Sequence, residues 1–313
     1  MTGFAMLFPG QGSQRVGMLK DWAERYTCVR ELIEEADSIL RRPLSTLMGQ
    51  GPSCELDQTQ NTQPAMLLAD VALWRVWLEE GGAQPAVVAG HSLGEYAAAV
   101  AAGVLEFAAA LRIVAVRARA MQEAVPKGTG AMAAVVGLDA ARVEQLCAAH
   151  SAGIVDAVNM NAPTQVVIAG EVAAVDAVCS AAKDAGARMA RRLPVSVPAH
   201  SRLMRTARGP LEAAFAEESW SDSHYPLLHN VDAQVRQGTA NVQAALLDQV
   251  HSPVQWVRTQ QRIQADFGCA RALECGPGNV LAGLGRRSGV ELAVQAFPAP
   301  EGLAESMQWV QGQ

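Results

Sequence analysis

The pentapeptide Gly90-His91-Ser92-Leu93-Gly94 constrains the fold of this chain more than any other feature of the sequence. It follows the apolar run Ala86-Val87-Val88-Ala89, which is typical of a buried strand, and a segment with helical character comes directly after it. A G-x-S-x-G sequence between a strand and a helix forms a sharp turn, because its glycines let the two elements approach without side-chain clashes. The turn presents the serine hydroxyl at the edge of the sheet, so we predict an α/β fold in which Ser92 is a nucleophile.

An attack by Ser92 on a carbonyl group needs backbone N–H groups that stabilise the resulting oxyanion. The N–H group of Leu93 lies at the start of the predicted helix, where it can face that charge. A second N–H group can come from the glycine-rich loop that begins at Pro9, directly after a predicted strand at 4–8. This loop is not a dinucleotide-binding motif, because Arg15 stands where the third glycine of G-x-G-x-x-G belongs.

The order of predicted elements indicates two structural units. Strands and helices alternate through most of the chain, which favours a parallel sheet, but residues 127–196 follow the ferredoxin-like order β-α-β-β-α-β. We therefore predict that residues 1–126 and 197–313 form an α/β-hydrolase-like catalytic domain, into which 127–196 is inserted as a ferredoxin-like small domain. Helices are expected at 21–40, 64–80, 94–102, 107–125, 139–151, 172–185, 203–215, 242–250 and 279–287, and strands at 4–8, 86–89, 131–137, 155–159, 165–169, 187–195, 227–231 and 270–275.

A serine hydroxyl becomes nucleophilic when a general base accepts its proton. His200 is the first candidate, because it lies where the chain returns from the small domain to the large one and can overhang the turn. The side chain of His91 is expected to point away from that of its neighbour Ser92. The sequence leaves the remaining histidines open: His150, His224, His229 and His251.

The predicted helix 107–125 carries Arg117 on an apolar face, whereas Arg112 and Arg119 share the opposite face. A guanidinium in apolar surroundings is costly unless an anion satisfies it. The anion is either an internal carboxylate or a substrate carboxylate held by two parallel hydrogen bonds. The second interpretation argues against a simple esterase. The apolar neighbours at helical spacing are Ala110, Ile113, Val114, Ala120, Met121 and Ala124.

Short motifs along almost the whole chain carry a family resemblance. They are Phe8-Pro9-Gly10-Gln11-Gly12-Ser13-Gln14, Gly17-Met18, Thr62-Gln63-Pro64-Ala65, Gly90–Tyr96, Met121–Pro126, Gly128–Ala133, Asn159–Pro163, Pro194–His200, Asn230-Val231-Asp232, Pro253–Trp256 and Glu274–Gly278. With these motifs the chain closely resembles the bacterial malonyl-CoA:acyl carrier protein transacylases of type II fatty-acid synthesis. The motif Val-Pro-Ser-His of that family reads Val-Pro-Ala-His here, a small change beside His200.

The resemblance implies a role for each matching residue. It implies that Ser92 is the nucleophile, that His200 is its base, and that Arg117 binds the malonyl carboxylate. It also implies an oxyanion hole formed by the N–H groups of Gln11 and Leu93, and a serine–histidine dyad without an acidic third member. The other matching positions are Gln63 and Met121, which line the pocket in the family, and Gln249, whose neighbourhood supplies a backbone carbonyl that orients the histidine.

Composition excludes several other classes of protein. A net charge of −6 provides no dominant positive field for nucleic acid, and no run of 18 apolar residues predicts a membrane span. The N-terminal residues lack the pattern of a signal peptide, so we expect a cytoplasmic protein, and nothing in the sequence demands an oligomer, so we expect a monomer. Neither a metal nor a cofactor is expected. The six cysteines form no C-x-x-C pair and lie at Cys28, Cys54, Cys147, Cys179, Cys269 and Cys275.

The predicted function is transfer of the malonyl group from malonyl-CoA to the phosphopantetheine thiol of acyl carrier protein, for fatty-acid synthesis. Acyl carrier proteins are acidic, so a locally basic docking face is expected. The alternatives are an acyltransferase that serves a polyketide synthase or a malonate decarboxylase, a serine hydrolase, and a non-catalytic module that binds a carrier protein. Candidates for the docking face are Lys183, Arg188, Arg191, Arg192, Arg286 and Arg287.

Overall fold

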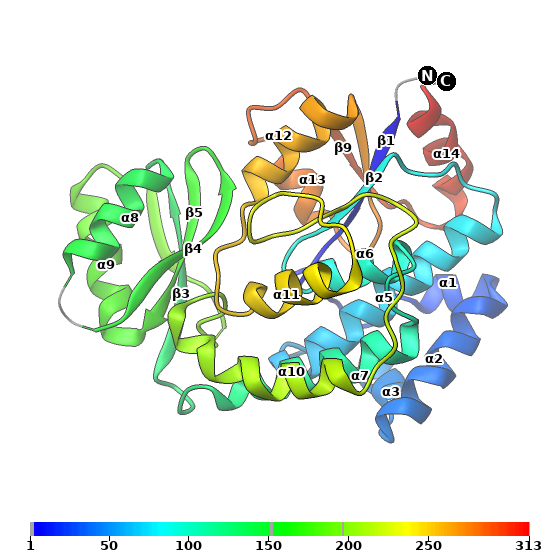
Figure 1. Ribbon diagram of the computed structural model, residues 1–313, viewed down its shortest axis with the longest axis horizontal. Coiled ribbons are helices and arrows are strands. Elements are labelled where there is room, and N and C mark those ends of the chain that lie inside the picture. The colour runs from blue at the N-terminus through cyan, green and yellow to red at the C-terminus, as the bar shows by residue number, and fades with distance from the viewer. Residues whose placement is uncertain (1–2, 151–152, 196, 313) are drawn as a thin grey trace.

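The computed structural model describes residues 3–150, 153–195 and 197–312 and contains two β-sheets, each with its own helices (Figure 1). Within these residues, sheet A is entirely parallel and sheet B entirely antiparallel. The strands of sheet A follow the order β7 (Leu227–Leu228), β2 (Val87–Gly90), β1 (Phe4–Phe8), β8 (Arg271–Glu274) and β9 (Ala293–Ala296). Those of sheet B follow the order β4 (Val155–Ala162), β5 (Gln165–Glu171), β3 (Gly130–Val136) and β6 (Met189–Arg192).

The two sheets confirm the predicted fold class, an α/β protein with a parallel sheet and a second, ferredoxin-like unit. Sheet B is formed by one continuous stretch of the chain, and Figure 1 shows this unit (green) beside the larger one. The domain boundaries at 126/127 and 196/197 stay a prediction. Four residues at which predicted domains or helices begin or end lie outside the described residues: Met1, Ser151, Ser196 and Gln313.

Helices cover both faces of sheet A, as a parallel sheet with buried strands requires. Around this sheet lie α1 (Lys20–Arg25), α2 (Thr27–Leu40), α3 (Leu44–Gln50), α4 (Ser53–Leu56), α5 (Thr59–Glu79), α6 (Gly94–Ala101), α7 (Phe107–Glu123), α10 (Arg208–Ala216), α11 (Thr239–Gln249), α12 (Trp256–Phe267), α13 (Val280–Gly285) and α14 (Leu303–Gln311), with short 3₁₀ helices at Arg202–Ala207 and Pro300–Gly302. No helix of the described residues is long and apolar enough to span a membrane.

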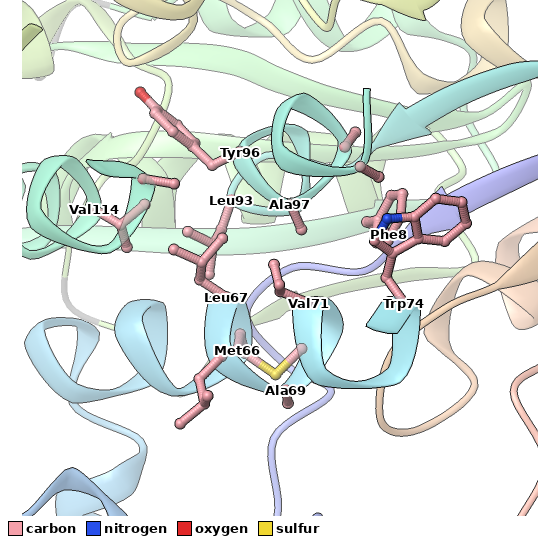
Figure 2. Close-up of a cluster of buried hydrophobic side chains, with 14 of the residues drawn as sticks. Phe8, Met66, Leu67, Ala69, Val71, Trp74, Leu93, Tyr96, Ala97 and Val114 are labelled. Atoms are coloured by element: carbon pink, nitrogen blue, oxygen red, sulfur yellow. The ribbon is translucent and has the colours of Figure 1, made fainter. Parts of the chain in front are cut away.

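Alternate side chains of sheet A enter two different apolar layers. In β1, Phe4, Met6 and Phe8 join the layer that contains α5 and α6, and Ala5 and Leu7 join the layer with α12 and α13. Figure 2 shows the first of these layers. There, Leu67 of α5 points toward Leu93, so the side chain of Leu93 is anchored in the core directly beside the serine turn.

Sheet B has one covered and one open face. Its covered face packs on α8 (Ala140–Ala149) and α9 (Val172–Asp184) through small aliphatic side chains. On the other face, Met132 and Val167 form a smaller apolar cluster, which turns toward the large unit. The ferredoxin-like unit therefore contributes one wall to the space above sheet A.

Several predicted elements have different bounds in the structure, for identifiable reasons. The predicted helix 21–40 is two helices, because Tyr26 is extended with φ −115° and ψ 126°. The predicted strand 227–231 ends at Leu228, because the backbone N–H of His229 donates to the Gln234 carbonyl and that of Asn230 donates to Glu95, instead of to a neighbouring strand. The predicted strand 187–195 forms only at Met189–Arg192, and the first turns of the predicted helix 203–215 are a 3₁₀ helix.

The predicted helix 64–80 begins five residues earlier, at Thr59, so that Pro64 lies inside α5. Proline has no N–H group to bond to the carbonyl of Gln60 four residues before it. That carbonyl accepts a hydrogen bond from Arg42 Nη2 at 3.0 Å, which satisfies it from outside the helix. The elements that the sequence did not predict are α3, α4, α12, α14 and β9.

Two glycines allow β1, β2 and α6 to meet at contact distance. A Cβ atom on Gly94 would lie 2.0 Å from the carbonyl oxygen of Phe8, and one on Gly90 would lie 2.0 Å from the carbonyl group of Gly94. Between them, Ser92 has a φ of 54°, which residues other than glycine rarely adopt. The structure thus shows the sharp strand-to-helix turn that the pentapeptide predicts.

We expect Gly94→Ala to destabilise the fold by about 1–3 kcal/mol or more, because the added methyl group would force α6 away from β1. Gly209→Ala is the matched control, because a Cβ at this helical position meets no atom within 4 Å. The control should be neutral or stabilising by up to about 1 kcal/mol. Urea unfolding of both variants measures the difference, and a Gly94→Ala protein as stable as the control would contradict the close approach.

Candidate active site

Ser92 and His200 form a hydrogen-bonded pair, although 108 positions separate them in the chain. The distance from Ser92 Oγ to His200 Nε2 is 2.7 Å, and His200 Nδ1 lies 2.8 Å from the backbone carbonyl of Gln249. Because a carbonyl oxygen only accepts, Nδ1 carries the proton and Nε2 is left to accept the proton of the serine hydroxyl. This is the arrangement of a nucleophile with its general base.

Burial keeps the imidazole of His200 neutral. The side chain is almost completely enclosed, and this burial, together with the positive charge of Arg117, lowers the pKa of His200 to about 3. The hydrogen-bond partner of Nδ1 is a backbone carbonyl and not a carboxylate, so no negative charge opposes this effect directly. The pair is a dyad, in which the base is unprotonated at neutral pH.

Arg117 projects from α7 into the same site, and its side chain is only 1% exposed. Its Nη1 donates to Gln63 Oε1 at 2.6 Å, and its Nη2 donates to Gln249 Oε1 at 2.8 Å and lies 3.5 Å from Ser92 Oγ. The guanidinium also lies over the Tyr96 ring, 5.5 Å from its centroid. No carboxylate of the described residues lies within 4.0 Å of it, so the internal salt bridge that the sequence left open is not formed.

Gln249, at the end of α11, connects the histidine with the arginine. Its backbone carbonyl accepts from His200, its Oε1 accepts from Arg117, and its Nε2 donates to the Ser92 carbonyl at 2.8 Å. The sequence predicted only a carbonyl from the neighbourhood of Gln249, whereas the structure identifies that carbonyl as its own. Gln63 and Met121 lie next to each other beside Arg117, with 3.5 Å between Gln63 Nε2 and Met121 Sδ.

The backbone N–H groups of Gln11 and Leu93 flank the serine. The two segments approach closely because of Gly10, where a Cβ atom would lie 2.5 Å from the His91 carbonyl oxygen. In the described part of the chain neither N–H group donates to another protein group, so both remain available to an oxyanion. Gln11, Ser92 and Leu93 all line one cavity.

This cavity has a volume of about 500 Å³ and lies between the end of sheet A and the open face of sheet B. The large unit contributes Ser92, Arg117 and His200 to its lining, and sheet B contributes apolar side chains such as Met132 and Val167. Polar groups from β4 also reach it: Asn161 Oδ1 lies 2.8 Å from His91 Nε2. The cavity is large enough for an acyl group and an extended chain behind it.

The remaining histidines stay outside the dyad. His91 points from Ser92 toward Asn161, as predicted, and His229 bonds to Glu95 beneath the site. His150, His224 and His251 do not line the cavity. In the part of the chain that the structure describes, no group of three or more His, Cys, Asp or Glu side chains is arranged to hold a metal ion.

Residues 5–289 match the family model of the acyl transferase domain. A malonyl CoA-acyl carrier protein transacylase from Salmonella typhimurium is 46% identical over 308 residues, which cover 98% of this chain and 99% of that protein. The malonyl CoA-acyl carrier protein transacylase of Coxiella burnetii has a structure that superposes with a TM-score of 0.96 at 42% identity, covering 99% of this chain and 98% of that one.

The chain belongs to the malonyl CoA-acyl carrier protein transacylase family. A further solved structure is a type II PKS acyl-carrier protein in complex with its malonyl-transacylase. This chain resembles it with a TM-score of 0.95 and 44% identity, covering 98% of this chain and 99% of that one. The identities extend along almost the full length, so the resemblance includes both sheets and the site between them.

Sequence reasoning missed two buried residues beneath the dyad of this family member, Asn230 and Glu95. Asn230 holds the turn, because its Oδ1 accepts from the Ser92 N–H at 2.7 Å and its Nδ2 donates to the Gly90 carbonyl at 2.6 Å. Glu95 accepts from Gln249 Nε2 and lies 2.7 Å from His229 Nδ1. Glu95 and Asn230 both stand in the short motifs of the sequence, but nothing in the sequence brings these motifs together.

The low pKa of His200 makes a testable contribution to stability. An exposed histidine in the unfolded chain titrates near pH 6.5, whereas His200 in the folded protein titrates at about 3. Between these values the unfolded chain binds a proton that the folded protein does not, so stability falls as the pH drops, by at most about 1.4 kcal/mol per pH unit.

His200→Gln removes this contribution, so the variant should lose less stability than the unaltered protein between about pH 6.5 and pH 4.5. Urea unfolding followed by circular dichroism across this range measures both slopes. Parallel slopes for the two proteins would contradict a strongly lowered pKa of His200.

Proposed function

We propose that this protein transfers the malonyl group of malonyl-CoA to the phosphopantetheine thiol of acyl carrier protein, through a malonyl ester on Ser92. The observation that carries this proposal is the guanidinium of Arg117, which is buried, has no carboxylate partner among the described residues and lies 3.5 Å from Ser92 Oγ. A site that only hydrolysed neutral esters would gain nothing from a buried cation at this position. A malonyl group attached to Ser92 carries its free carboxylate toward such a cation.

In the first half-reaction, His200 Nε2 accepts the proton of Ser92 Oγ as the oxygen attacks the thioester carbonyl. The negative charge on the carbonyl oxygen is stabilised by the N–H groups of Gln11 and Leu93. When the tetrahedral intermediate collapses, the carbon–sulfur bond breaks and His200 returns the proton to the thiolate of CoA. The malonyl ester of Ser92 remains.

In the second half-reaction, His200 accepts the proton of the phosphopantetheine thiol, whose sulfur attacks the ester carbonyl. The same two N–H groups stabilise the oxyanion, and Ser92 leaves as the free hydroxyl after taking the proton back from His200. The thiol of CoA leaves before the phosphopantetheine thiol of the carrier protein binds at the same site, so the kinetics are ping-pong. These steps use only groups of the protein and its substrates, and they require neither a metal nor a redox cofactor.

The names of the family members support the acceptor as well as the donor, because they include both CoA and acyl carrier protein. Fatty-acid synthesis is the proposed pathway, with a polyketide synthase as the alternative, since one structural neighbour is bound to a type II PKS carrier protein. The cytoplasmic location stays a proposal. It is supported by the six cysteines, which are all among the described residues and are all free thiols.

Of the basic residues proposed for carrier docking, Arg192 is already paired with Asp176, and Arg287 donates to Gln165 Oε1 at 3.2 Å. Gln165 lines the cavity, so Arg287 lies near its rim. A phosphopantetheine arm that enters the cavity brings the acidic carrier protein against this rim. The individual docking residues stay a prediction.

Intact-mass analysis after incubation with malonyl-CoA, acetyl-CoA or methylmalonyl-CoA tests the proposal. We expect a malonyl adduct on Ser92, its absence in Ser92→Ala, and its loss when phosphopantetheinylated acyl carrier protein is added. Failure to form the malonyl adduct would overturn the proposed function. Rapid loss of the adduct in water without a carrier protein would identify a hydrolase instead.

Arg117→Ala should reduce the rate of malonyl loading by about 30-fold or more, because removing one partner of a buried charged contact costs about 2–5 kcal/mol. Acetyl loading, which involves no carboxylate, should change much less. Arg112→Ala is the matched control on the same helix, where the exposed arginine pairs with Glu218 at 2.6 Å. Equal losses of malonyl and acetyl loading in Arg117→Ala would show that this arginine is only structural.

A further inference from the structure

The buried guanidinium of Arg117 raises a problem of charge balance. Its hydrogen-bond partners are the amide oxygens of Gln63 and Gln249, which carry no net charge. Burial of an unpaired cation is costly, and burial accordingly lowers the pKa of Arg117. A folded protein with this residue therefore needs a negative charge close by.

That negative charge is present one amide group away. Glu95 Oε2 accepts from Gln249 Nε2 at 2.7 Å, while Oε1 of the same Gln249 amide accepts from Arg117 Nη2 at 2.8 Å. The amide dipole thus points its positive end at the carboxylate and its negative end at the guanidinium, which strengthens both hydrogen bonds. The carboxylate, the amide and the guanidinium form one continuous buried chain.

Several hydrogen-bonding groups surround the carboxylate of Glu95. Its carboxylate accepts from Gln249 Nε2 and from the Asn230 N–H at 3.2 Å, and it lies 2.7 Å from His229 Nδ1. Hydrogen-bond donors on several sides stabilise a buried carboxylate.

His229 does not cancel this charge. In the described residues its Nε2 is buried without a hydrogen-bond partner. An imidazolium would leave a charged N–H donor unsatisfied there, whereas a neutral ring with its proton on Nδ1 leaves only a lone pair. The favoured state is a neutral His229 that donates to Glu95, so the negative charge of Glu95 remains available to Arg117.

We infer that Glu95 is the counter-charge of Arg117, linked to it through the side-chain amide of Gln249. A direct salt bridge would occupy the guanidinium and close it to other carboxylates. Because the Glu95 carboxylate lies behind a neutral amide, it balances the buried cation without occupying it. The Nη2 edge of Arg117 is therefore left facing Ser92 Oγ. Glu95 is in these terms a positioning residue for substrate recognition, since it contacts neither Ser92 Oγ nor the cavity.

This inference rests on the proposed function, because it assigns the open edge of Arg117 to the malonyl carboxylate. A residue that gave only structural support would be equally destabilising to replace in the malonylated and in the acetylated protein. If the charge of Glu95 is removed, the malonyl carboxylate becomes the nearest anion for Arg117, and malonylation then restores stability that the substitution removed. Acetylation of Ser92 adds no charge and restores nothing.

Glu95→Gln is the test variant, because it removes the charge and keeps the shape. Glu274→Gln is the matched control, since Glu274 is equally buried and bonds to the N–H groups of Leu281 and Ala282, away from Arg117. Melting temperatures are measured for the free, malonylated and acetylated forms of each protein, with every adduct verified by intact mass. We expect both variants to melt lower than the unaltered protein. Malonylation should raise the melting temperature of Glu95→Gln several degrees more than that of the other two, and acetylation should not.

A second measurement needs no substrate. Glu95→Gln is combined with Arg117→Met, and urea unfolding of the four proteins gives the coupling between the two positions. The substitution at Glu95 should cost stability when Arg117 is present, and should cost less or become stabilising when Arg117 is replaced. Glu274→Gln should cost the same in both backgrounds.

Equal costs of Glu95→Gln in the two backgrounds, or equal shifts on malonylation and acetylation, would overturn the inference. If the unaltered protein forms no malonyl adduct while the coupling is present, the proposed function fails and the counter-charge stands. If the adduct forms and the coupling is absent, the function stands and the counter-charge fails. The two conclusions are therefore tested separately.

Discussion

The close contact between backbone atoms at Gly90 and Gly94 is the constraint on which the rest of the site depends. Because neither residue has a Cβ atom, α6 begins against the carbonyl of Phe8, and Ser92 is held in a left-handed conformation between them. The N–H of Leu93 then faces the same space as the serine hydroxyl, while the Leu93 side chain is fixed in the core (Figure 2). The proposed nucleophile and the proposed oxyanion donor are thus positioned by steric exclusion in one short turn.

The charges and protonation states of the neighbouring residues are the second requirement of the site. The proposed base, His200, is neutral because it is buried beside Arg117 and bonded to a backbone carbonyl. The cation of Arg117 is tolerated because the Glu95 carboxylate lies behind the Gln249 amide. A carboxylate placed directly on His200 would raise the pKa of the imidazole, and one placed directly on Arg117 would block the guanidinium. Glu95 bonds to the Gln249 amide and to neither His200 nor Arg117, so its position avoids both effects.

The sequence predicts the parts of the site that are local, and the structure adds those that depend on distant contacts. The turn at Ser92 and the apolar surroundings of Arg117 follow from glycine spacing and helical periodicity. Without the family resemblance, the sequence leaves His200 as the first of several candidate histidines. Glu95 and Asn230 had no predicted role, because their partners lie more than 130 positions away in the chain. The strand predicted to continue to Val231 was wrong for the same reason, since the backbone N–H of Asn230 donates to the distant Glu95.

Gln249 uses its main chain to orient His200 and its side chain to hold Arg117. A substitution at this position that adapts the site to a different acyl group keeps the main-chain carbonyl but also removes the side-chain hydrogen bond to the Ser92 carbonyl. Gln63 contacts Arg117 and Met121 without touching the histidine. Substitutions at Gln63 are therefore better suited to changing the acyl preference, because the contacts of Gln63 with the acyl-binding groups are separate from the proton transfer by His200.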